Sequence, residues 1–293
     1  MKVFITGTES FVGKELIKEL DKLGYDLFGC DKNEVSDERF FKADIRSKGL
    51  VDKINSDIDI IIHLAALSSD PLCKGKEYSC FDINVMGTLN MLQFAMEKNC
   101  RKFIFASSEW VYENIDSSDY LNEDQIIDPT KIKSEYAFSK LVSEINIKQK
   151  YDTKFCEVAI LRFGIIYGSR KIGTAVESIF SKIYKDEKLS IGSANTGRCF
   201  IHVDDIVQGI ISSIKLNGFN ILNLVGNELI TLGDIIEVCD KIANKNSEYL
   251  VLDSNSIDQR KISNNLAKVT MGWSPRVDLF HGISLLNKYY NSL

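Results

Sequence analysis

Apolar residues in the first half of the chain follow two alternating spacings. Short continuous runs of β-branched and aromatic residues are typical of strands, and stretches with apolar residues three or four positions apart are typical of helices. The runs predict strands at residues 3–6, 26–31, 40–43, 58–66, 102–106 and 158–163. The helical spacing predicts helices that begin near residues 11, 84 and 134. Strands and helices that alternate through short connections require a parallel sheet, so we expect an α/β fold with a doubly wound sheet.

The alternation becomes looser after Gly168. The pattern there predicts four helices, over 174–185, from Asp204, over 231–243 and over 279–291, and three strands, over 199–203, 220–225 and 249–252. We expect the first two of these strands to return to the sheet. Because no linker or repeat separates the two parts, we expect two interleaved domains. The sheet domain comprises residues 1–167 and 199–225, and the smaller domain comprises residues 168–198 and 226–293.

The first strand runs directly into the first helix through Gly7-Thr8-Glu9-Ser10-Phe11-Val12-Gly13. A helix that begins at the end of a strand presents free N–H groups and the positive end of its dipole, which suit a pyrophosphate. Gly7 can adopt turn dihedrals that a side chain forbids, and Gly13 lets the helix lie close to the strand. Ser10 stands where a bare backbone would best meet the phosphates, and we expect it to be tolerated because it is small. We expect Glu9 to point away; the alternative is a strand, turn and helix that bind no ligand.

Polar or small residues follow several of the other strands, at Asp31, Asp44, Ala65-Ala66 and Ser107-Ser108. Parallel sheets bind ligands at the edge where the carboxyl ends of their strands meet. In a dinucleotide-binding fold, Asp31 would bond the adenosine ribose hydroxyls and repel a 2′-phosphate, which favours NAD over NADP. Lys32 weakens that preference slightly, and Asp44-Ile45 is placed where an adenine edge could be met. His63 lies inside an apolar run, and we expect a core histidine there and no ligand-binding role.

Composition and charge exclude several classes of partner. The 293 residues are 44% hydrophobic and 26% charged, as in ordinary globular proteins, and their number allows one large or two moderate domains. The net charge of −5, without a basic run, gives no reason to expect nucleic acid or an anionic membrane surface as partner. No apolar run approaches the length of a membrane span, and the chain begins in a strand without a leader, so we expect a cytoplasmic protein. Seven cysteines without CxxC spacing predict buried thiols, with neither a disulfide framework nor a metal site.

Tyr136 and Lys140 lie four residues apart on one predicted helix and therefore on one face. A phenol has a pKa of about 10, and a neighbouring ammonium together with an oxidised nicotinamide would favour its ionised form. Lowering the pKa by about three units requires roughly 4 kcal/mol of differential stabilisation. A serine hydroxyl at the end of the 102–106 strand could bond the same substrate oxygen. The YxxxK spacing alone is common by chance, and its weight here comes from the cofactor-binding pattern that precedes it.

The order and spacing of these motifs resemble the NAD-dependent epimerase/dehydratase family of extended short-chain dehydrogenases/reductases. The resemblance covers nearly the whole chain. It rests on Thr6-Gly7 with Gly13, Asp31, Asp44-Ile45, His63 to Ala66, Asn84-Val85-x-Gly87-Thr88, Ser107-Ser108 with Val111-Tyr112, Tyr136-x-x-x-Lys140, Leu161-Arg162 with Tyr167-Gly168, Arg198-x-Phe200-Ile201-His202-Val203-Asp204-Asp205 and Met271-Gly272-Trp273-Ser274-Pro275.

The resemblance implies a Rossmann-type NAD-binding domain and a smaller C-terminal domain that binds a nucleotide-diphosphate sugar. Tyr136 would be the acid/base on a sugar hydroxyl, Lys140 would hold the nicotinamide ribose, and Ser108 would be the hydroxyl partner. The implied cofactor-binding residues are Gly7, Ser10, Phe11, Val12, Gly13, Asp31, Asp44, Ile45, Leu64, Ala65, Ala66, Asn84, Ser107, Tyr136, Lys140 and Phe163. Arg198 and Arg260 would contact the substrate diphosphate, with a surface salt bridge as the alternative for Arg260. His202 and Asp204-Asp205 are expected to be structural.

The chain also departs from the family pattern. Ser10, Glu113, Ile165 and Cys199 replace residues that are usual in the family, which affects details of nucleotide binding. Trp110 occupies the position at which the 4,6-dehydratases carry a glutamate. Glu109 is one residue off and, on a strand-like segment, would face elsewhere. A dehydratase is therefore disfavoured.

We expect a nucleotide-sugar epimerase that oxidises the sugar transiently at C4 with bound NAD, similar to UDP-glucose 4-epimerase. The alternatives are an NAD(P)-dependent 4-dehydrogenase or 4-ketoreductase and, from another class, a non-catalytic NAD-binding scaffold. The family resemblance also implies a homodimer through the helices that begin near 84 and 134. Specificity is expected to lie in the loops 67–81, 113–133 and 168–198.

Overall fold

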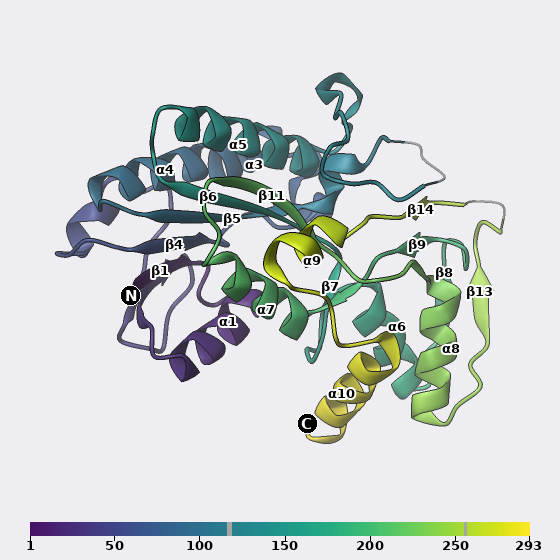
Figure 1. Ribbon diagram of the computed structural model, residues 1–293. Helices are drawn as coiled ribbons and strands as arrows, with labels where there is room; N and C mark the ends of the chain where they lie inside the picture. The colour runs from purple at the N-terminus through teal and green to yellow at the C-terminus, as the bar shows by residue number, and fades with distance from the viewer. Residues whose placement is uncertain (116–118, 255–256) are drawn as a thin grey trace. The chain divides into compact units, whose positions relative to one another are not determined.

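The computed structural model describes residues 1–115, 119–254 and 257–293 (Figure 1). Residues 116–118, in the expected specificity loop, lie outside the described residues. The chain divides into two compact units. The first comprises Met1–Asp116, Glu123–Arg162 and Val207–Leu222, and the second comprises Ser117–Asn122, Phe163–Ile206 and Asn223–Leu293. The units are interleaved in the sequence. Residues 163–167, 199–206 and 223–225 belong to the second unit, whereas the sequence pattern assigns all of them to the sheet domain.

A seven-stranded sheet forms the framework, in the order β11-β6-β5-β4-β1-β2-β3. The registers of β1 with β2 and β4, of β2 with β3 and of β4 with β5 are parallel, as the alternation predicts. The strands are β1 (Lys2–Thr6), β2 (Asp26–Asp31), β3 (Phe40–Lys42), β4 (Ile60–His63), β5 (Lys102–Ser108), β6 (Glu157–Phe163) and β11 (Phe219–Leu224). The prediction of a doubly wound α/β sheet is confirmed.

Helices cover both faces of this sheet. Figure 1 shows α4 (Gly87–Glu97) and α5 (Glu135–Asp152) on one face and α1 (Phe11–Lys22) and α7 (Val203–Ser213) on the other. Two short helices, α2 (Asp70–Cys73) and α3 (Glu77–Phe81), precede α4. The core between the sheet and α4 includes Phe4 and Phe94, whose ring centroids lie 4.8 Å apart. All four residues of β4 are buried, as the continuous apolar run requires.

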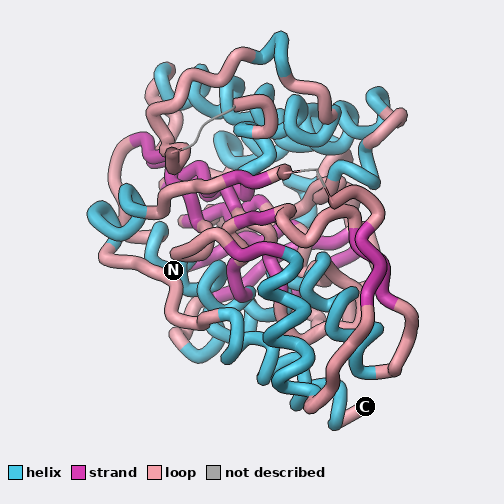
Figure 2. The backbone as a smooth tube through the Cα atoms, turned by 90° about the vertical axis from the view of Figure 1, so that its right-hand side faces the viewer, coloured by secondary structure: helices cyan, strands magenta, loops and turns pink. Residues whose placement is uncertain are grey.

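The second unit is built from short strands and from helices, and Figure 2 shows strands and helices along the backbone. Its strands form three small sheets, in the orders β10-β7, β12-β9-β14 and β13-β8. They are β7 (Ile166–Tyr167), β8 (Leu189–Ile191), β9 (Gly197–Arg198), β10 (Ile201–His202), β12 (Ile230–Thr231), β13 (Tyr249–Val251) and β14 (Gln259–Arg260). The helices are α6 (Ala175–Tyr184), α8 (Leu232–Ala243), α9 (Asn265–Met271) and α10 (Leu279–Asn291), and apolar residues of α6, α8 and α10 share one core.

Two local predictions are wrong. The segment 199–203 does not return to the large sheet, because its two-residue strand β10 pairs with β7 after Gly164 has redirected the chain. A Cβ at Gly164 would lie 2.9 Å from the Cys199 carbonyl oxygen, so only glycine permits that approach. The segment Glu109–Tyr112, expected to be strand-like, forms a 3₁₀ turn, and the Ser108 hydroxyl before it accepts from the Trp110 N–H at 3.3 Å.

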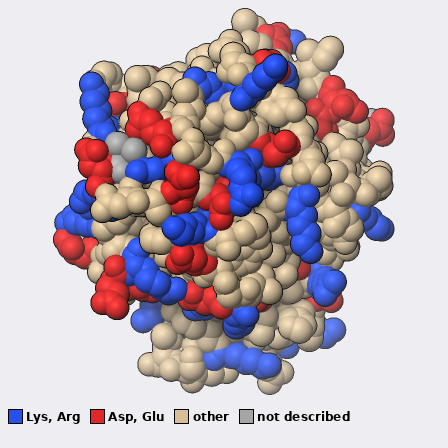
Figure 3. Space-filling view, turned by 60° about the vertical axis from the view of Figure 1, so that its left-hand side comes forward, with Lys and Arg blue, Asp and Glu red and all other residues tan. Residues whose placement is uncertain are grey.

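The visible surface carries no large patch of one sign. Figure 3 shows lysine and arginine side chains interspersed with aspartate and glutamate side chains over the face that it displays. Among the described residues, no helix combines the length and the hydrophobicity needed to cross a bilayer.

Candidate active site

The turn between β1 and α1 has the backbone that the two glycines predict. Gly7 adopts a φ of +79°, and a Cβ there would lie 3.0 Å from the backbone nitrogen of Ala65, so a side chain would meet both strain and crowding. A Cβ on Gly13 would overlap the Gly7 carbonyl oxygen. α1 therefore starts in direct contact with the end of β1, and its first N–H groups are presented at the carboxyl edge of the sheet.

Ser10 has a role that the sequence reasoning missed. Its hydroxyl donates to the Gly7 carbonyl oxygen at 2.7 Å and accepts from the Gly13 N–H at 3.0 Å, so it is the N-cap of α1. A serine directly before an amphipathic helix is the usual signal for this role. Glu9 forms an ion pair with Lys14 at 2.9 Å, in agreement with the expectation that it points away. Phe11 and Val12 form the first turn of α1.

The double use of the Ser10 hydroxyl leads to a prediction. We expect Ser10→Ala to lower the free energy of unfolding by about 1 kcal/mol because the cap is lost, whereas Ser10→Gly should cost only a few tenths. Both variants keep the space above the turn open, so NAD affinity should change little. Chemical denaturation and a fluorescence titration with NAD measure the two effects. Equal stability of both variants and the wild type would contradict the capping role.

Asp31 connects the end of β2 to the same turn. Its carboxylate accepts from the Glu9 N–H and from the Asn33 N–H, both at 2.9 Å, and the residue is buried. An ionised carboxylate has about four acceptor positions, so two remain for the hydroxyls of a ribose. Thr8 in this turn has a buried hydroxyl oxygen without a hydrogen-bond partner. The open glycine backbone, the helix N-terminus, Asp31 and the Thr8 hydroxyl together fit a dinucleotide.

The residues after β3 and β4 lie at the same edge of the sheet. The Asp44 carboxylate is held by Arg46, with Nη2 at 2.6 Å from Oδ2, and this hydrogen bonding lowers the pKa of Asp44. The Ile45 side chain is buried, and it fills the space beside Gly87 of α4. Only the backbone of Ile45 can therefore meet a ligand. Leu64, Ala65 and Ala66 follow β4, and Ala65 donates its N–H to the Thr6 hydroxyl at 3.1 Å.

The Asn84 side chain is hydrogen-bonded both to the segment after β4 and to α5. Asn84 lies in a π-helical turn, Asp82–Met86. Its side-chain amide accepts from Leu67 N at 2.8 Å and donates to the Leu67 carbonyl oxygen at 3.1 Å and to the Ser139 hydroxyl at 2.9 Å. Asn84 therefore holds the segment after β4 against α5, and its effect on a cofactor would come through that segment.

His63 is a core histidine, as expected. Its Nδ1 lies 2.7 Å from the Thr6 hydroxyl and its Nε2 lies 3.1 Å from the Thr88 hydroxyl. Thr88 uses its own proton to bond the Asn84 carbonyl oxygen, so Nε2 carries the imidazole proton and Nδ1 accepts. Burial, followed by the charge of Lys140, lowers the pKa of His63 to about 3.

The depressed pKa of His63 predicts a loss of stability in mild acid. Above pH 6.5 the imidazole is neutral in both the folded and the unfolded chain and has no effect. Between pH 6.5 and about 3 only the unfolded chain takes up the proton, so the free energy of unfolding falls by up to about 1.4 kcal/mol per pH unit. Denaturant unfolding at pH 7.5, 6 and 5 measures this slope. His63→Gln should be less stable at pH 7.5 but less sensitive to acid, and an unchanged slope would contradict the assignment.

Tyr136 and Lys140 lie in the first two turns of α5, whose N-cap is the Ser134 hydroxyl. Both side chains are buried. Lys140 donates from Nζ to the Ala106 carbonyl oxygen at 2.7 Å and lies 4.8 Å from the centre of the Phe105 ring. The Ser108 hydroxyl, at the end of β5, is hydrogen-bonded to the Tyr136 phenol. The fold thus brings the three expected catalytic residues together at the carboxyl edge of the sheet.

Burial dominates the electrostatics of the Tyr136 phenol. Burial raises the pKa of Tyr136 to about 12, and the hydrogen bond with Ser108 offsets only part of that rise. Burial also lowers the pKa of Lys140 to about 8. The expected lowering of the Tyr136 pKa depends on an oxidised nicotinamide as well as on Lys140, so it stays a prediction. Desolvation of the phenolate opposes it, and the Lys140 ammonium is bonded to Ala106.

Cysteine, leucine and tryptophan side chains pack against one side of the Tyr136 ring. Cys73, Cys80, Leu67 and Trp110 pack against it, and the Trp110 ring meets it edge-on at 6.5 Å between centroids. These residues keep water from the phenol on that side, which is one cause of its raised pKa.

Glu109, next to Trp110, is buried, and its charge also raises the pKa of Tyr136. The strand that the expectation for Glu109 assumed is wrong, because the chain forms a 3₁₀ turn there.

Two candidate functional residues, Glu144 and Arg162, were given no role from the sequence. Glu144 of α5 and Arg162 of β6 form a buried ion pair at 2.7 Å. The Ser107 hydroxyl, expected to meet the cofactor, donates to Glu144. Glu144 follows Tyr136 and Lys140 at the same four-residue spacing, and this spacing could have predicted that it lies on the same face of the helix.

The two arginines expected to bind the diphosphate lie in the second unit. Arg198 on β9 and Arg260 on β14 are register partners on neighbouring strands. Arg198 is bonded to Asp258, with Nη2 at 2.7 Å from Oδ2. Arg260 is 8% exposed, so the alternative of a surface salt bridge is wrong. Phe163 is the last residue of β6.

His202 and Asp205 have structural contacts, as expected. The His202 Nδ1 accepts from the Asp204 N–H at 3.3 Å, at the start of α7. The Asp205 carboxylate accepts from the N–H groups of Arg276 and Val277 at 2.9 and 3.0 Å. These bonds tie the start of α7 to the segment before α10.

Several known proteins are similar to this chain over nearly its whole length. A curated relative from Methanocaldococcus jannaschii, provisionally named UDP-glucose 4-epimerase, is 28% identical, with 96% of this chain and 95% of the relative covered. UDP-glucuronic acid decarboxylase 3 of Arabidopsis thaliana is 25% identical, with 98% and 88% covered. The solved structure of UDP-glucuronic acid 4-epimerase from Bacillus cereus, in complex with UDP-glucuronic acid and NAD, has a TM-score of 0.85 and 25% identity, with 100% of this chain and 99% of that chain covered.

The match to a family model extends from β1 through β6 into β11. The model is that of the NAD-dependent epimerase/dehydratase family, and it matches residues 3–223. This range contains the turn, Asp31, the segment after β4 and the group formed by Ser108, Tyr136 and Lys140. The resemblance inferred from the sequence is confirmed, and the chain belongs to the NAD-dependent epimerase/dehydratase family.

Proposed function

We propose that this protein is an NAD-dependent nucleotide-sugar epimerase that acts by transient oxidation at C4 of the sugar. The observation that carries the proposal is the grouping of the Tyr136 phenol, the Ser108 hydroxyl and the Lys140 ammonium in the unit that also contains the Gly7 to Gly13 turn. The epimerase names of its relatives support the choice of reaction.

The residues of the first unit would hold the cofactor through distinct groups. The N–H groups at the start of α1 would bind the pyrophosphate, and Asp31 would bind the adenosine ribose. Lys140 has three donor protons and uses one on Ala106, so it could also bind the nicotinamide ribose. NAD would supply a hydride acceptor that later returns the hydride.

Tyr136 would act as the general base and then as the general acid. It would accept the proton of the C4 hydroxyl while the carbon-bound hydrogen leaves with its electron pair, and it would return the proton after the 4-keto sugar has turned over. Ser108 would donate a hydrogen bond to the same oxygen. With a pKa of about 12 in the buried site, the phenol needs nearby positive charge to act as a base at neutral pH. Lys140, with a pKa of about 8, is mostly charged there.

Arg198 and Arg260 are proposed to bind the diphosphate of the nucleotide sugar. Guanidinium groups bind phosphate oxygens in a bidentate way, and the register of β9 and β14 places the two residues side by side. The substrate would then be a nucleotide-diphosphate sugar with a free C4 hydroxyl.

The test is turnover on a panel of UDP-glucose, UDP-galactose and UDP-glucuronate, without and with added NAD(P)⁺ or NAD(P)H. An epimerase interconverts C4 epimers without added cofactor and with no net change in absorbance at 340 nm. A stoichiometric change at 340 nm would instead identify a one-way dehydrogenase or reductase, and CO₂ release from UDP-glucuronate would identify a decarboxylase. NAD binding without turnover on a broader panel of nucleotide sugars would identify a non-catalytic scaffold.

A homodimer in the cytoplasm is part of the proposal. Exposed apolar side chains occur in and just before α4, at Met86, Leu89 and Met96, and on α5, at Phe138 and Ile145. α4 and α5 lie side by side (Figure 1), so a second copy could cover these side chains in a four-helix contact. All seven cysteines are free thiols, as expected for a reducing compartment.

The oligomeric state can be measured directly. Sedimentation equilibrium should give about twice the chain mass of 33.1 kDa. The double variant Leu89→Glu/Ile145→Glu should give the mass of one chain, because two charges would be buried in the contact. A monomeric wild-type protein would contradict the proposed dimer.

A further inference from the structure

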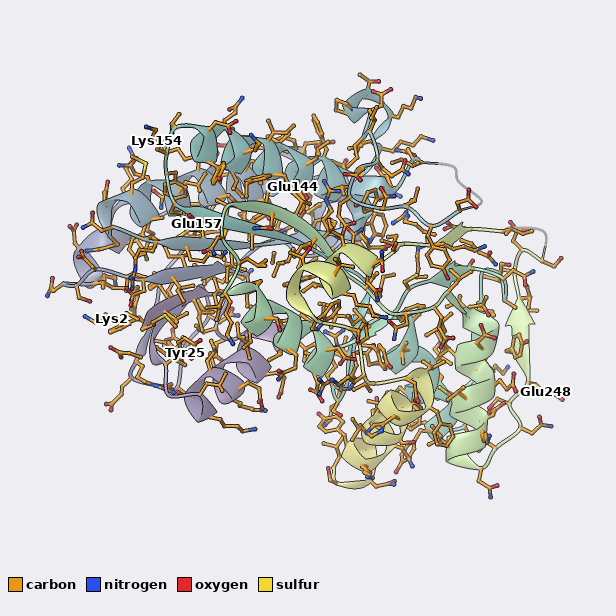
Figure 4. The ribbon with its side chains drawn as sticks, in the orientation of Figure 1. Lys2, Tyr25, Glu144, Lys154, Glu157 and Glu248 are labelled. Carbon is orange, nitrogen blue, oxygen red and sulfur yellow. The ribbon has the colours of Figure 1, made fainter. Side chains whose placement is uncertain are left out.

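The buried face of α5 carries one charged residue beyond Lys140. Tyr136, Lys140 and Glu144 follow each other at four-residue intervals, so they occupy one face of the helix in successive turns. Glu144 is 4% exposed, and Figure 4 shows it on α5 toward the strands of the sheet. A carboxylate removed from water requires hydrogen-bond partners of its own.

The partners of the Glu144 carboxylate come from two strands. Arg162 on β6 donates from Nε to Oε1 at 3.0 Å and from Nη2 to Oε2 at 2.7 Å. The Ser107 hydroxyl on β5 donates to Oε1. Arg162 also donates from Nη1 to the Tyr112 hydroxyl at 2.7 Å. One carboxylate therefore ties α5 to β5 and to β6, and the guanidinium extends the connection to the turn after β5.

The end of β5 meets α5 at three consecutive residues. The Ala106 carbonyl oxygen accepts from Lys140 Nζ at 2.7 Å. Ser107 is bound by the carboxylate described above, and the next hydroxyl, that of Ser108, is bonded to the Tyr136 phenol. A shift of the end of β5 along the helix would therefore change all three contacts at once.

We propose that Glu144 is a positioning residue, which holds the end of β5 against the catalytic face of α5 through Ser107 and Arg162. The proposal rests on the proposed function for the role of Tyr136 and Ser108. A buried ion pair adds little net stability over apolar side chains of similar volume, but it imposes one geometry on its partners. Reacting groups need such a constraint, since a misplacement of about 1 Å can slow a reaction about a hundredfold.

The decisive variant replaces the whole polar group by apolar side chains. Glu144→Gln alone would leave the Arg162 charge buried and unpaired, so it is expected to destabilise the fold. The triple variant Ser107→Ala/Glu144→Met/Arg162→Met leaves neither charge behind and should fold with a melting temperature close to that of the wild type. We expect its kcat to fall about 10- to 100-fold, with the KM for the sugar nucleotide and the Kd for NAD within about threefold.

A matched control and a milder variant complete the design. Ser213→Ala also removes a buried hydroxyl, one that is bonded within α7 to Ile210, and it should leave kcat unchanged. Ser107→Ala keeps the ion pair and removes only the bond to β5. It should lower kcat several-fold. If the triple variant does not fold, the kcat of Ser107→Ala tests the positioning role of Glu144.

A second readout needs no substrate. In protein labelled with 3-fluorotyrosine, the ¹⁹F resonance of Tyr136 is assigned by its loss in Tyr136→Phe. We expect this resonance to shift in Ser107→Ala and in the triple variant but not in Ser213→Ala. If the wild type turns over no nucleotide sugar, the proposed function fails while this readout still judges the positioning. A folded triple variant with wild-type kcat, or an unchanged Tyr136 resonance in every variant, would overturn the inference.

Discussion

Replacement of Tyr136 by phenylalanine is expected to lower kcat about a thousandfold, the usual scale for loss of a general acid/base. The change removes only the hydroxyl, so the ring keeps its packing against Cys73, Cys80 and Trp110. The fold and the affinity for NAD should therefore stay close to those of the wild type. Steady-state kinetics at saturating nucleotide sugar, together with an NAD titration, measure the two effects separately.

The control for this variant is Tyr78→Phe. Tyr78 is 84% exposed, so loss of its hydroxyl should leave kcat, KM and NAD affinity unchanged. Full turnover in Tyr136→Phe would remove Tyr136 from the reaction. A fall in kcat that comes with a similar loss of NAD binding would show that the phenol acts in cofactor binding.

Replacement of Gly13 by alanine is expected to lower the affinity for NAD at least about a hundredfold, or by about 2.7 kcal/mol. The added Cβ would overlap the Gly7 carbonyl oxygen and would lie 3.0 Å from the Ser10 hydroxyl oxygen. Because the carbonyl belongs to the backbone, either α1 must move away from β1 or the turn must deform. Overpacking of this kind also costs about 1 to 3 kcal/mol of stability.

The matched control is Gly49→Ala. Gly49 has a φ of −83°, and a Cβ there would come no nearer than 3.7 Å to the Asp52 carboxylate. This variant should keep both its melting temperature and its NAD affinity. Calorimetric titration with NAD and thermal unfolding of both variants make the comparison. Unchanged NAD binding in Gly13→Ala would place the dinucleotide elsewhere.

Prediction from sequence succeeded where the signal is local. The helix predicted over 279–291 is observed as Leu279–Asn291, and the strand predicted over 26–31 is observed as Asp26–Asp31. The hydrophobic periodicity of these segments indicates which of their residues are buried, and it can be recognised without information about distant residues. The glycine turn was predicted for the same reason, since the φ of Gly7 depends on nearby backbone.

Prediction failed where the outcome depends on distant partners. The strand at 199–203 has β-forming residues, but its pairing depends on β7, which forms a separate two-stranded sheet with β10. Burial raises the pKa of the Tyr136 phenol, and the spacing of Tyr136 and Lys140 along the chain does not indicate that burial. Ser10 is an exception. Its position directly before an amphipathic helix could have predicted its capping role, but that role was not predicted.

The sequence by itself determined the doubly wound sheet, the glycine turn and the helix that carries Tyr136 and Lys140, because hydrophobic periodicity and glycine placement act over a few residues. Only the tertiary structure decided what surrounds the phenol and where each buried polar group finds its partner. Ser107 and Arg162 come from different strands, yet both bind Glu144. Such contacts follow from the stacking of helix on sheet, and local spacing along the chain does not encode them.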